Sequence, residues 1–519
     1  MECPPKKRSK DDKEAENGSP LTSNKRGRLD LTSDTTSFDG VDLSQRVSWG
    51  KFAPYTDTVV TFTPVGTAPD FSSDSPALCF HLNAISHRAR ACTIHLKQQP
   101  GQRHPRPVET PIFMPVGTKG CLKALPLQEL VYDPALSCPI ILANTYHLAI
   151  QPKTELIAEM GGLHSFQGLD QIDGNNHSSY NLLTDSGGFQ MVSLVKLSQV
   201  SEEGVSFENP FTQRATSKDQ STSDMRTKDL LLLRPEDSIR HQNNIGANII
   251  MALDDVVSSV TENDERFVTA THRTLRWYDR CYKSHAKKDT QNLFPIVQGG
   301  LDTGLGGLRE QCLAGFRHRE LDLNYQTPGY AIGGLAGGES KEEFWRVVDQ
   351  CCRALPDNKP RYLMGVGYPL DLVVCTALGV DMYDCVYPTR TARFGTCLVQ
   401  GPAPGTLKLK SHKFASDHNI IEENCSCQAC RKGITRATLH SLLKTGNPVA
   451  VELITQHNIT HMMSLVRRMR LSIMEGTFAE FAMHFVKDQY PGIKCGGEDP
   501  PTWVIDALNA AGINVPHYS

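Results

Sequence analysis

Short apolar runs, each ending in glycine, proline, asparagine or aspartate, recur through most of the chain and constrain its fold more than any other feature. From about Phe80 onward they include PIILAN, NIIMALDD, LFPIVQGG, RYLMGVG and VDMYDCVYP. Amphipathic stretches such as RPEDSIRHQNNIG and KEEFWRVVDQCCRAL lie between several of them and predict helices. Continuous apolar strands that alternate with helices predict a parallel sheet covered on its faces. The fold class is therefore α/β, either a doubly wound sheet or a closed (β/α)8 barrel of the TIM type.

The barrel is the better fit to these runs. No glycine-rich fingerprint followed by an acid about twenty residues on is evident in the sequence, which weakens a dinucleotide-binding fold. In a (β/α)8 barrel the loops at the carboxyl ends of the strands build the active site. The polar or sulfur-containing residues that end the runs are then the expected site of chemistry: Asp185, Asp254, Gln298, Met364 and Asp384.

Composition narrows the class of protein. The 519 residues are 39% hydrophobic and 21% charged, without an apolar run near eighteen residues, so we expect a globular protein with no membrane span. The first residues, MECPPKKRSKDDKE, carry no secretory signal, and the 16 cysteines then favour reduced thiols, with any cluster suspected of binding metal. A formal charge of −3 means that RNA binding would need a local basic surface.

Texture along the chain predicts three segments. Residues 1–75 are polar with few apolar clusters and are expected to be a disordered tail, residues 76–410 the barrel, and residues 411–519 a zinc-binding subdomain inserted near the C-terminus with helices that complete the barrel. The tail contains the basic runs PPKKRSK and NKRGR, which suit either a nuclear-import signal or solvated charge. We expect a cytoplasmic protein, with nuclear import if these runs act as a signal.

Two acids stand at the ends of distant apolar runs. Asp185 follows Leu182 and Leu183 and precedes a glycine pair that allows a sharp turn, and Asp384 precedes two arginines. Two carboxylates at one barrel mouth offer a nucleophile and a proton-transfer partner, because burial separates their pKa values and so their roles. The residues alone leave two alternatives open: Asp185 could cap the next helix, and Asp384 could be a structural partner of Arg390.

The sequence resembles the tRNA-guanine transglycosylase family, in particular its eukaryotic queuine-inserting branch. The landmarks, in order, are ETPIFMPVGTKG, ANTYHL, TDSGGFQ, ALDD, IVQGG, AIGGLAGGE, YLMGVG, DMYDCVYPTRTARFGT and CSCQACR. They run from about Thr110 through the C-terminal region, about four-fifths of the chain. The resemblance implies a pentosyltransferase that exchanges guanine for queuine at the wobble position of tRNAs with G-U-N anticodons, with Asp384 as the nucleophile and Asp185 as the proton-transfer residue.

The same resemblance implies a pocket for the base. Phe189 and Met364 would sandwich the heterocycle, although core packing is the alternative for both. Its polar edge would be read by Ser186, Asp254, Gln298, Gly334 and Leu335; for Gln298 the alternative is an amide that satisfies loop backbone. Val256 and Gly337 stand where the bacterial branch usually carries cysteine and valine, and a glycine opens room for the bulkier queuine side chain. Drift without effect on specificity is the alternative for these two.

A second constellation suits a metal. Cys425, Cys427 and Cys430 lie within six residues, and with one imidazole they can complete a tetrahedral, structural Zn²⁺ site; free buried cysteines are the alternative. His440, His457 and His461 compete as the fourth ligand. The resemblance selects His457.

Partners follow from the same comparison of motifs. Arg390 and Arg393 are expected to hold bases of the tRNA anticodon loop, and a set of further basic residues to meet phosphates: Lys408, Lys410, Lys413, Lys432, Arg467, Arg468 and Arg470. The resemblance also implies a heterodimer with a catalytically silent homologue. Two other functions stay open, a non-catalytic tRNA-binding accessory subunit and a barrel hydrolase with a catalytic metal, but both aspartates are intact and the only evident metal cluster is rich in thiolates.

Overall fold

The computed structural model describes residues 37–38, 41–49, 60–61, 63–72, 75–169, 179–188, 199–208, 230–261, 264–493 and 497–515. Phe189 and both basic runs of the tail lie outside these residues.

Nine parallel strand segments form the central sheet. They are β7 (Ile112–Gly117), β8 (Ile140–Ala143), β9 (Asn181–Thr184), β13 (Ile249–Met251), β14 (Asn292–Phe294), β15 (Ile296–Val297), β16 (Tyr330–Ile332), β17 (Arg361–Leu363) and β18 (Met382–Cys385). Their order is β14-β13-β9-β8-β7-β18-β17-β16-β15.

The sheet closes on itself at Pro295. This residue alone separates β14, which pairs with β13, from β15, which pairs with β16. Hydrogen bonds from Ala252 N to Phe294 O (3.0 Å) and from Ala331 N to Pro295 O (2.9 Å) join the two sides. With β14 and β15 counted as one interrupted strand, the nine segments make eight strands, and the predicted (β/α)8 barrel is confirmed.

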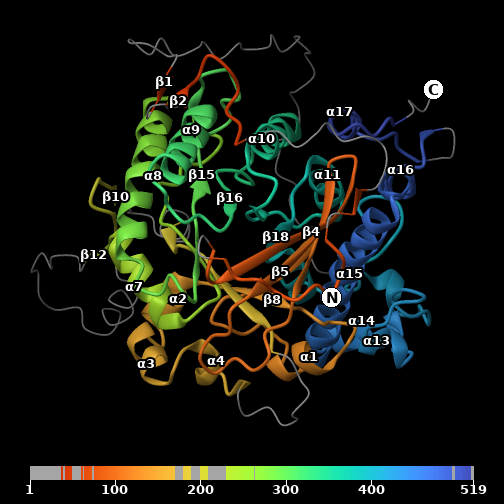
Figure 1. Cartoon of the computed structure of the whole chain (residues 1–519). Helices are drawn as coiled ribbons and strands as arrows, with labels where there is room; N and C mark the ends of the chain where they lie inside the picture. Colours follow the sequence, from red (N-terminus) through yellow and green to blue (C-terminus); the bar gives the residue numbers. More distant parts are fainter. Residues whose placement is uncertain are drawn as a thin grey trace, which may run out of the picture. The chain divides into compact units, whose positions relative to one another are not determined.

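Helices α7 to α11 lie outside the ring of strands (Figure 1). The helices of the barrel and its loops are α1 (Leu127–Tyr132), α2 (Thr145–Ile150), α3 (Thr154–Glu159), α4 (Leu163–Phe166), α7 (Pro235–Ile245), α8 (Asp264–Ser284), α9 (Leu308–Leu321), α10 (Lys341–Ala354), α11 (Pro369–Leu378) and α12 (Tyr387–Arg393). Local sequence sets their ends. Ser340 and Glu343 form a reciprocal capping box at the start of α10, and Gly246 (φ 75°) ends α7 in the left-handed conformation.

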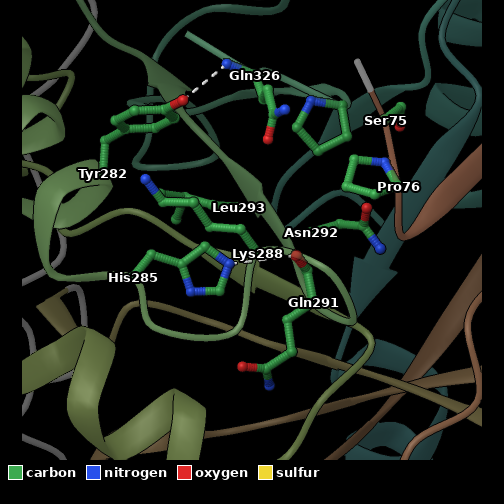
Figure 2. A pocket seen from close by; sticks show the side chains of 10 residues that line it. Ser75, Pro76, Tyr282, His285, Lys288, Gln291, Asn292, Leu293 and Gln326 are labelled. Atoms are coloured by element: carbon green, nitrogen blue, oxygen red, sulfur yellow. Dashed lines mark hydrogen bonds between the residues drawn. The ribbon is translucent and has the colours of Figure 1, made fainter. Parts of the chain in front are cut away.

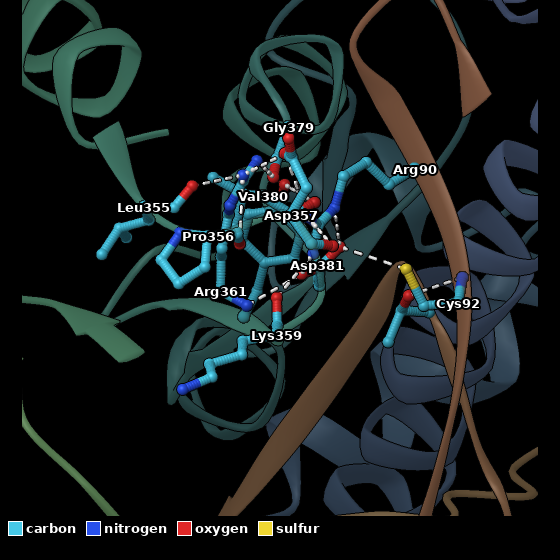
Figure 3. A network of polar contacts seen from close by, with 12 residues as sticks. Arg90, Cys92, Leu355, Pro356, Asp357, Lys359, Arg361, Gly379, Val380 and Asp381 are labelled. Atoms are coloured by element: carbon cyan, nitrogen blue, oxygen red, sulfur yellow. Dashed lines mark hydrogen bonds and ion pairs between the residues drawn. The ribbon is translucent and has the colours of Figure 1, made fainter. Parts of the chain in front are cut away.

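An antiparallel sheet of β3 (Val60–Thr61), β4 (Leu78–Ser86), β5 (Ala89–Leu96) and β6 (Val108–Thr110) is fastened to the amino-terminal ends of the barrel strands. Arg90 reaches from β5 to Asp381, the residue before β18, with Nε 3.1 Å from Oδ1 (Figure 3). Asp381 also accepts from the backbone N of Arg361 at 2.8 Å. Both charged side chains are almost fully buried, and their mutual hydrogen bonds compensate their desolvation. This network fixes Asp381, three residues before Asp384, and with it the start of β18.

Residues 41–49 contact the barrel although they belong to the segment predicted to be disordered. Val41, Leu43 and Val47 are buried, and Arg46 forms a 2.8 Å ion pair with Glu310 of α9. A short hairpin of β1 (Ser37–Phe38) and β2 (Val41–Asp42) precedes this contact. These few apolar side chains supply burial that the average composition of the tail conceals. The predicted segment boundaries at 75/76 and 410/411 stay predictions.

The C-terminal part has a second, smaller hydrophobic cluster that includes Phe414, Ile421 and Leu439. The remaining elements are β10 (Gln199–Val200), β11 (Val205–Glu208), β12 (Leu230–Leu233), β19 (Thr396–Leu398), β20 (Thr406–Lys408), a 3₁₀ turn (His412–Phe414), α13 (Gln428–Arg431), α14 (Arg436–Lys444), α15 (Pro448–Glu475), α16 (Phe478–Gln489) and α17 (Thr502–Ala510). Helix α15 starts in the small cluster with Leu453 and ends in the barrel core with Met469, so it joins the two. Among the described helices, none is long and apolar enough to cross a membrane.

Candidate active site and metal centre

The predicted chemical residues meet at the carboxyl ends of the barrel strands. Asp185 follows β9, Asp254 lies three residues after β13, and Asp384 lies within β18, and Gln298 and Met364 directly follow β15 and β17. Parallel strands of one barrel end at the same face, so these side chains share that face.

Asp185 is 7% exposed and is held by the loop after the neighbouring strand β8. Asn144 Nδ2 donates to Oδ2 at 2.6 Å, and the backbone N of Thr145 donates to Oδ1 at 2.9 Å. Thr145 Oγ1 also donates to the Asp185 backbone carbonyl at 2.6 Å. The carboxylate thus meets the start of α2, which follows the neighbouring strand β8. These bonds fix its orientation.

Asp384 is half-buried, and one of its oxygens receives two hydrogen bonds. The hydroxyl of Tyr362 donates to Oδ1 at 2.6 Å, and the backbone N of Gly365 donates to the same atom at 2.8 Å. Burial raises the pKa of Asp384, while these two donors oppose the rise. Both of these hydrogen bonds reach Oδ1, so among the described residues Oδ2 is the oxygen that stays available to react.

Tyr362 links the two acids, and sequence reasoning missed it. The side chain is fully buried, and its pKa is raised well above the ordinary value by burial, by the Asp384 charge and its hydrogen bond, and by the Asp185 charge. The phenol therefore stays a protonated donor. Because the charges of both carboxylates act on this one phenol, and because β9 and β18 end at the same face of the barrel, Asp185 and Asp384 lie on the same side of the barrel. The sequence held a signal for it: side chains alternate along a strand, so Tyr362 on β17 points to the same side as Met364, the residue that directly follows β17.

Asp254 is the centre of a buried polar cluster. Gln298 Nε2 donates to Oδ2 at 2.6 Å, and Ser186 Oγ donates to Oδ1 at 3.3 Å. Burial raises the pKa of Asp254 to about 6, and the two side-chain hydrogen bonds limit the rise. Gln298 is thus a partner of a carboxylate, which does not fit the alternative of a side chain that only satisfies loop backbone. An ionised Asp254 presents an acceptor for paired N–H groups.

The loop after β16 packs directly over this cluster. Two features favour glycine at position 334. Its φ of 71° lies in the left-handed region, and a Cβ there would clash with Gln298 Oε1. Arg309 is fully buried and donates to the carbonyls of Val297 (2.9 Å) and Gly333 (3.0 Å), which ties the loop after β15 to the loop after β16. Leu335 is half-buried beside them. Arg309 is a second residue that sequence reasoning missed.

Val256 and Gly337 lie on loops that touch each other. Val256 is half-buried and Gly337 is exposed. Ser259 Oγ, three residues after Val256, donates to Glu339 Oε2 at 2.7 Å, and Gly337 N donates to the same atom at 2.9 Å. A Cβ at position 337 would lie 2.6 Å from Ser259 Oγ. The roles of both residues in base choice stay predictions.

Met364 and the two arginines complete the described part of the site. Met364 is half-buried against the barrel core, and Phe189, its predicted partner across the base, lies outside the described residues. Arg390 is exposed and Arg393 half-buried on α12, which begins three residues after Asp384. Among the predicted phosphate contacts, Arg470 departs from expectation: it is buried and donates to the carbonyls of Cys92 (2.7 Å) and Thr110 (2.8 Å).

A cavity at the amino-terminal end of β14 does not belong to this site. It is lined by Tyr282, His285, Gln291 and Asn292, among others (Figure 2). Burial lowers the pKa of His285 to about 4, so the imidazole is neutral there. The volume of about 20 Å³ is room for one water molecule and not for a purine.

Cys425, Cys427, Cys430 and His457 converge in the C-terminal cluster, with all four ligand atoms within 4.8 Å of one another. His457 Nδ1 lies 3.5, 3.4 and 3.6 Å from the three sulfurs in that order. Zinc bonds of about 2.3 Å to sulfur and 2.0–2.1 Å to nitrogen give a tetrahedral edge of about 3.6 Å, which matches. His457 Nε2 bonds the carbonyl of Leu398 at 2.7 Å, which leaves Nδ1 for a metal. The four residues can therefore hold one metal ion.

The two competing histidines have other partners. His440 Nδ1 lies 2.7 Å from the carbonyl of Leu409, and His461 Nδ1 lies 3.5 Å from Glu422. Neither joins the cysteine cluster, and the choice of His457 agrees with the geometry.

The similarity to known proteins extends over the whole candidate site. The sequence model of the family described as queuine tRNA-ribosyltransferase matches residues 86–491. The chain is 43% identical over 450 residues to the queuine tRNA-ribosyltransferase catalytic subunit of Schizosaccharomyces pombe (86% of this chain, 99% of the relative). It is 42% identical over 416 residues to that of Caenorhabditis elegans (78% and 93%) and 40% identical over 405 residues to the queuine tRNA-ribosyltransferase of Thermus thermophilus (78% and 93%). Every predicted site residue falls within the matched range.

Proposed function

The chain belongs to the queuine tRNA-ribosyltransferase family, and from this premise we propose that it exchanges guanine for queuine at the wobble position of tRNAs with G-U-N anticodons. The observation that carries the proposal is that two carboxylates with fixed orientation, Asp185 and Asp384, follow or end strands whose carboxyl ends share one face of the barrel. Two such carboxylates at one face can serve a double displacement on one sugar.

The first half of the exchange breaks the bond between ribose C1′ and guanine N9. Asp384 Oδ2 attacks C1′, the C1′–N9 electron pair leaves with guanine, and Asp185 delivers the proton that the departing base takes up. The product is a covalent ester between Asp384 and the RNA. Tyr362 and Gly365 hold Oδ1, so the attacking carboxylate has one orientation.

The second half reverses these steps with a new base. Queuine N9–H gives its proton to Asp185, N9 attacks C1′, and the C1′–O bond breaks to return the Asp384 carboxylate. A covalent intermediate suits base exchange because the ribose stays activated while one heterocycle departs and another enters. The cycle needs no net proton, since Asp185 gives one and takes one.

Base recognition rests on Asp254. An ionised carboxylate accepts the paired N–H groups of a guanine-like edge, and a base without those donors would leave a buried charge unpaired. Gln298 and Ser186 keep this carboxylate in place, and the backbone of Gly334 and Leu335 borders it. Phe189 and Met364 are proposed to enclose the ring, and Val256 and Gly337 to leave room for the side chain of queuine.

The cysteine cluster is proposed to bind one structural Zn²⁺. The donor set of three thiolates and one imidazole fits zinc, and four protein ligands leave no open position for substrate. When bound, the ion would fasten α13 to α15, because Cys425 and Cys427 precede α13, Cys430 lies in it and His457 lies in α15. No step of the exchange uses it.

A homologous, non-catalytic subunit is the proposed partner, with the tRNA anticodon loop, queuine and guanine as ligands. The names of the fungal and nematode relatives contain the words "catalytic subunit", which supports an assembly with a second chain. We also propose a cytoplasmic location, with nuclear import through the basic runs of the tail. The accessory-subunit alternative gains no support, because both aspartates are present and stand at the carboxyl ends of barrel strands.

The exchange is tested by incubating the purified chain, with and without a homologous partner, with unmodified tRNA and radiolabelled guanine. Label should enter the RNA, and denaturing gels should show a protein–RNA adduct. Asp384→Asn should abolish both, whereas Asp322→Asn, at an exposed carboxylate paired with His318, should abolish neither. If the wild-type protein exchanged no guanine even with its partner, the function as a non-catalytic accessory subunit would be favoured. Exchange by Asp384→Asn would show that Asp384 is not the nucleophile.

A further inference from the structure

Large apolar side chains are exposed beside the nucleophile. Val386, two residues after Asp384, is 38% exposed, Tyr368 is 56% exposed and Phe394 is 65% exposed. Single exposed apolar residues are common on protein surfaces, but a group of them at the rim of a polar site marks a binding surface.

Three of the exposed residues lie on one face of α12. Val386, Arg390 and Phe394 are spaced four residues apart, and the flanking residues Val386 (φ −77°, ψ −3°) and Phe394 (φ −88°, ψ 0°) keep near-helical backbone angles. Residues four apart share a helix face. At about 1.5 Å per residue the row is about 12 Å long. We call these three residues the α12 row.

The opposite face of α12 is anchored, so the row cannot turn inward. Pro388, Thr389 and Ala392 are buried. Asn458 of α15 donates through Nδ2 to the carbonyls of Pro388 and Thr396, both at 3.0 Å. The exposure of Phe394 is therefore imposed by the fold and does not result from loose packing of the helix.

A pair of tyrosines borders the same rim. The rings of Tyr368 and Tyr387 lie 4.6 Å apart at 52°, and Lys341 Nζ lies 5.7 Å from the Tyr368 ring centre. The backbone at Gly367 lies close to Cys385, the neighbour of the nucleophile, and a Cβ at position 367 would clash with that cysteine. Two aromatic rings and one cation thus lie near the residue that follows the nucleophile.

We propose that the α12 row is a stacking surface for the RNA bases next to the exchanged nucleotide, with Phe394 as the ring that stacks. The proposal rests on the proposed function, since an RNA whose sugar reaches Asp384 must continue across this rim on both sides. Unpaired loop bases bind proteins by stacking on aromatic rings and arginine planes. Arg390 and Arg393 supply the positive charge that an RNA, and not an apolar protein partner, would select.

A double-mutant cycle with RNA tests the proposal. The substrates are an anticodon stem-loop and two versions with an abasic site on either side of the exchanged guanosine. Phe394→Ala should raise KM for the intact RNA about tenfold, the effect of one lost base–aromatic stack. With one abasic RNA, wild type and Phe394→Ala should behave alike, because the ring has lost its partner. Phe394→Trp should restore binding.

Binding without turnover separates stacking from charge. In an Asp384→Asn background, Phe394→Ala should weaken RNA binding about tenfold with an unchanged salt slope, whereas Arg390→Ala should reduce that slope by about 0.7. Leu471→Ala, at a 57% exposed apolar position on α15, is the matched control and should bind as wild type does. Phe394→Leu gives a second variant that keeps an apolar side chain without a ring.

Additive effects of Phe394→Ala and both abasic sites, or equal RNA affinity of Phe394→Ala and Leu471→Ala, would overturn the proposal. Equal RNA affinity of Phe394→Leu and the wild-type protein would also overturn it, because simple apolar contact would then explain the binding without stacking. Loss of guanine exchange in the wild-type protein would instead refute the proposed function, and the binding measurements distinguish the two failures.

Discussion

The hydroxyl of Tyr362 donates a 2.6 Å hydrogen bond to Oδ1 of Asp384, and the same hydroxyl lies within the field of Asp185. A buried, neutral donor orients the Asp384 carboxylate without adding charge. It also stabilises the ionised form of Asp384 against the desolvation that raises its pKa. Tyr362 is thus the residue through which the geometry of the nucleophile is set.

Replacing Tyr362 by phenylalanine should slow the exchange more than it weakens RNA binding. A hydrogen bond to a charged group contributes about 1.5–3 kcal/mol, so kcat should fall about 10- to 100-fold. Because the donor lowers the pKa of Asp384, its loss should move the acid limb of the kcat profile to higher pH. Steady-state kinetics from pH 5 to 8 would measure both effects.

Tyr383→Phe is the matched control for this variant. Tyr383 is also fully buried and adjoins Asp384 in sequence, but its hydroxyl lies 2.8 Å from Thr376 Oγ1. Its removal should leave the acid limb in place. An unshifted acid limb in Tyr362→Phe would show that the hydroxyl does not act on the nucleophile.

Acidic pH should weaken recognition of the base through Asp254. Burial raises the pKa of this carboxyl to about 6, so it is mostly ionised at pH 7 and becomes protonated as the pH falls through 6. A protonated carboxyl has lost an acceptor, and KM for guanine should rise about tenfold between pH 7 and pH 5. In Asp254→Asn, KM should be high at both pH values and lose this dependence.

Unfolding is not the expected cause of the weaker recognition of guanine at acidic pH. A carboxyl with a raised pKa binds its proton more tightly in the folded protein, so between pH 6 and pH 4 this group adds stability as the pH falls. Thermal unfolding at pH 7 and pH 5 checks that the protein is folded at both. A KM that stays constant from pH 7 to pH 5 would contradict the role of Asp254.

The barrel and most of the site could be predicted from sequence because their signals are local. Asp185 and Asp384 end apolar runs, and the three cysteines are close in sequence. Tyr362 could have been suspected from the alternation of side chains along its strand, but its bond to Asp384 joins two strands. Arg309 could not be found from local signals, since its role depends on contacts with loops that are distant from it in the chain. Residues 41–49 were misjudged for a related reason: Val41, Leu43 and Val47 are too few to change the average composition of the tail, yet they bury against α9 and its neighbours.

Loss of the fourth ligand should empty the metal centre and destabilise the C-terminal cluster. His457→Ala should lower the metal content from one zinc per chain to none and lower the unfolding temperature by several degrees, because metal binding is coupled to folding of the site. His440→Ala removes a buried imidazole that bonds only the Leu409 carbonyl among the described residues, and it should keep one zinc. Elemental analysis and calorimetry measure these outcomes, and zinc retained in His457→Ala would reassign the ligand.

Gly337→Val should discriminate between the two bases that the enzyme handles. The φ angle of Gly337 lies outside the left-handed region, so valine adds no backbone strain, but its Cβ would lie 2.6 Å from Ser259 Oγ and fill the space between the two loops. We expect KM for queuine to rise at least about tenfold, while KM for guanine, the internal control, changes less than about threefold. Competition between labelled guanine and unlabelled queuine measures the ratio. The double variant Gly337→Val and Ser259→Ala relieves the contact, so recovery of queuine use by it would assign the effect to displacement of the Ser259 loop. Equal effects of Gly337→Val alone on KM for both bases would show that position 337 does not set base choice.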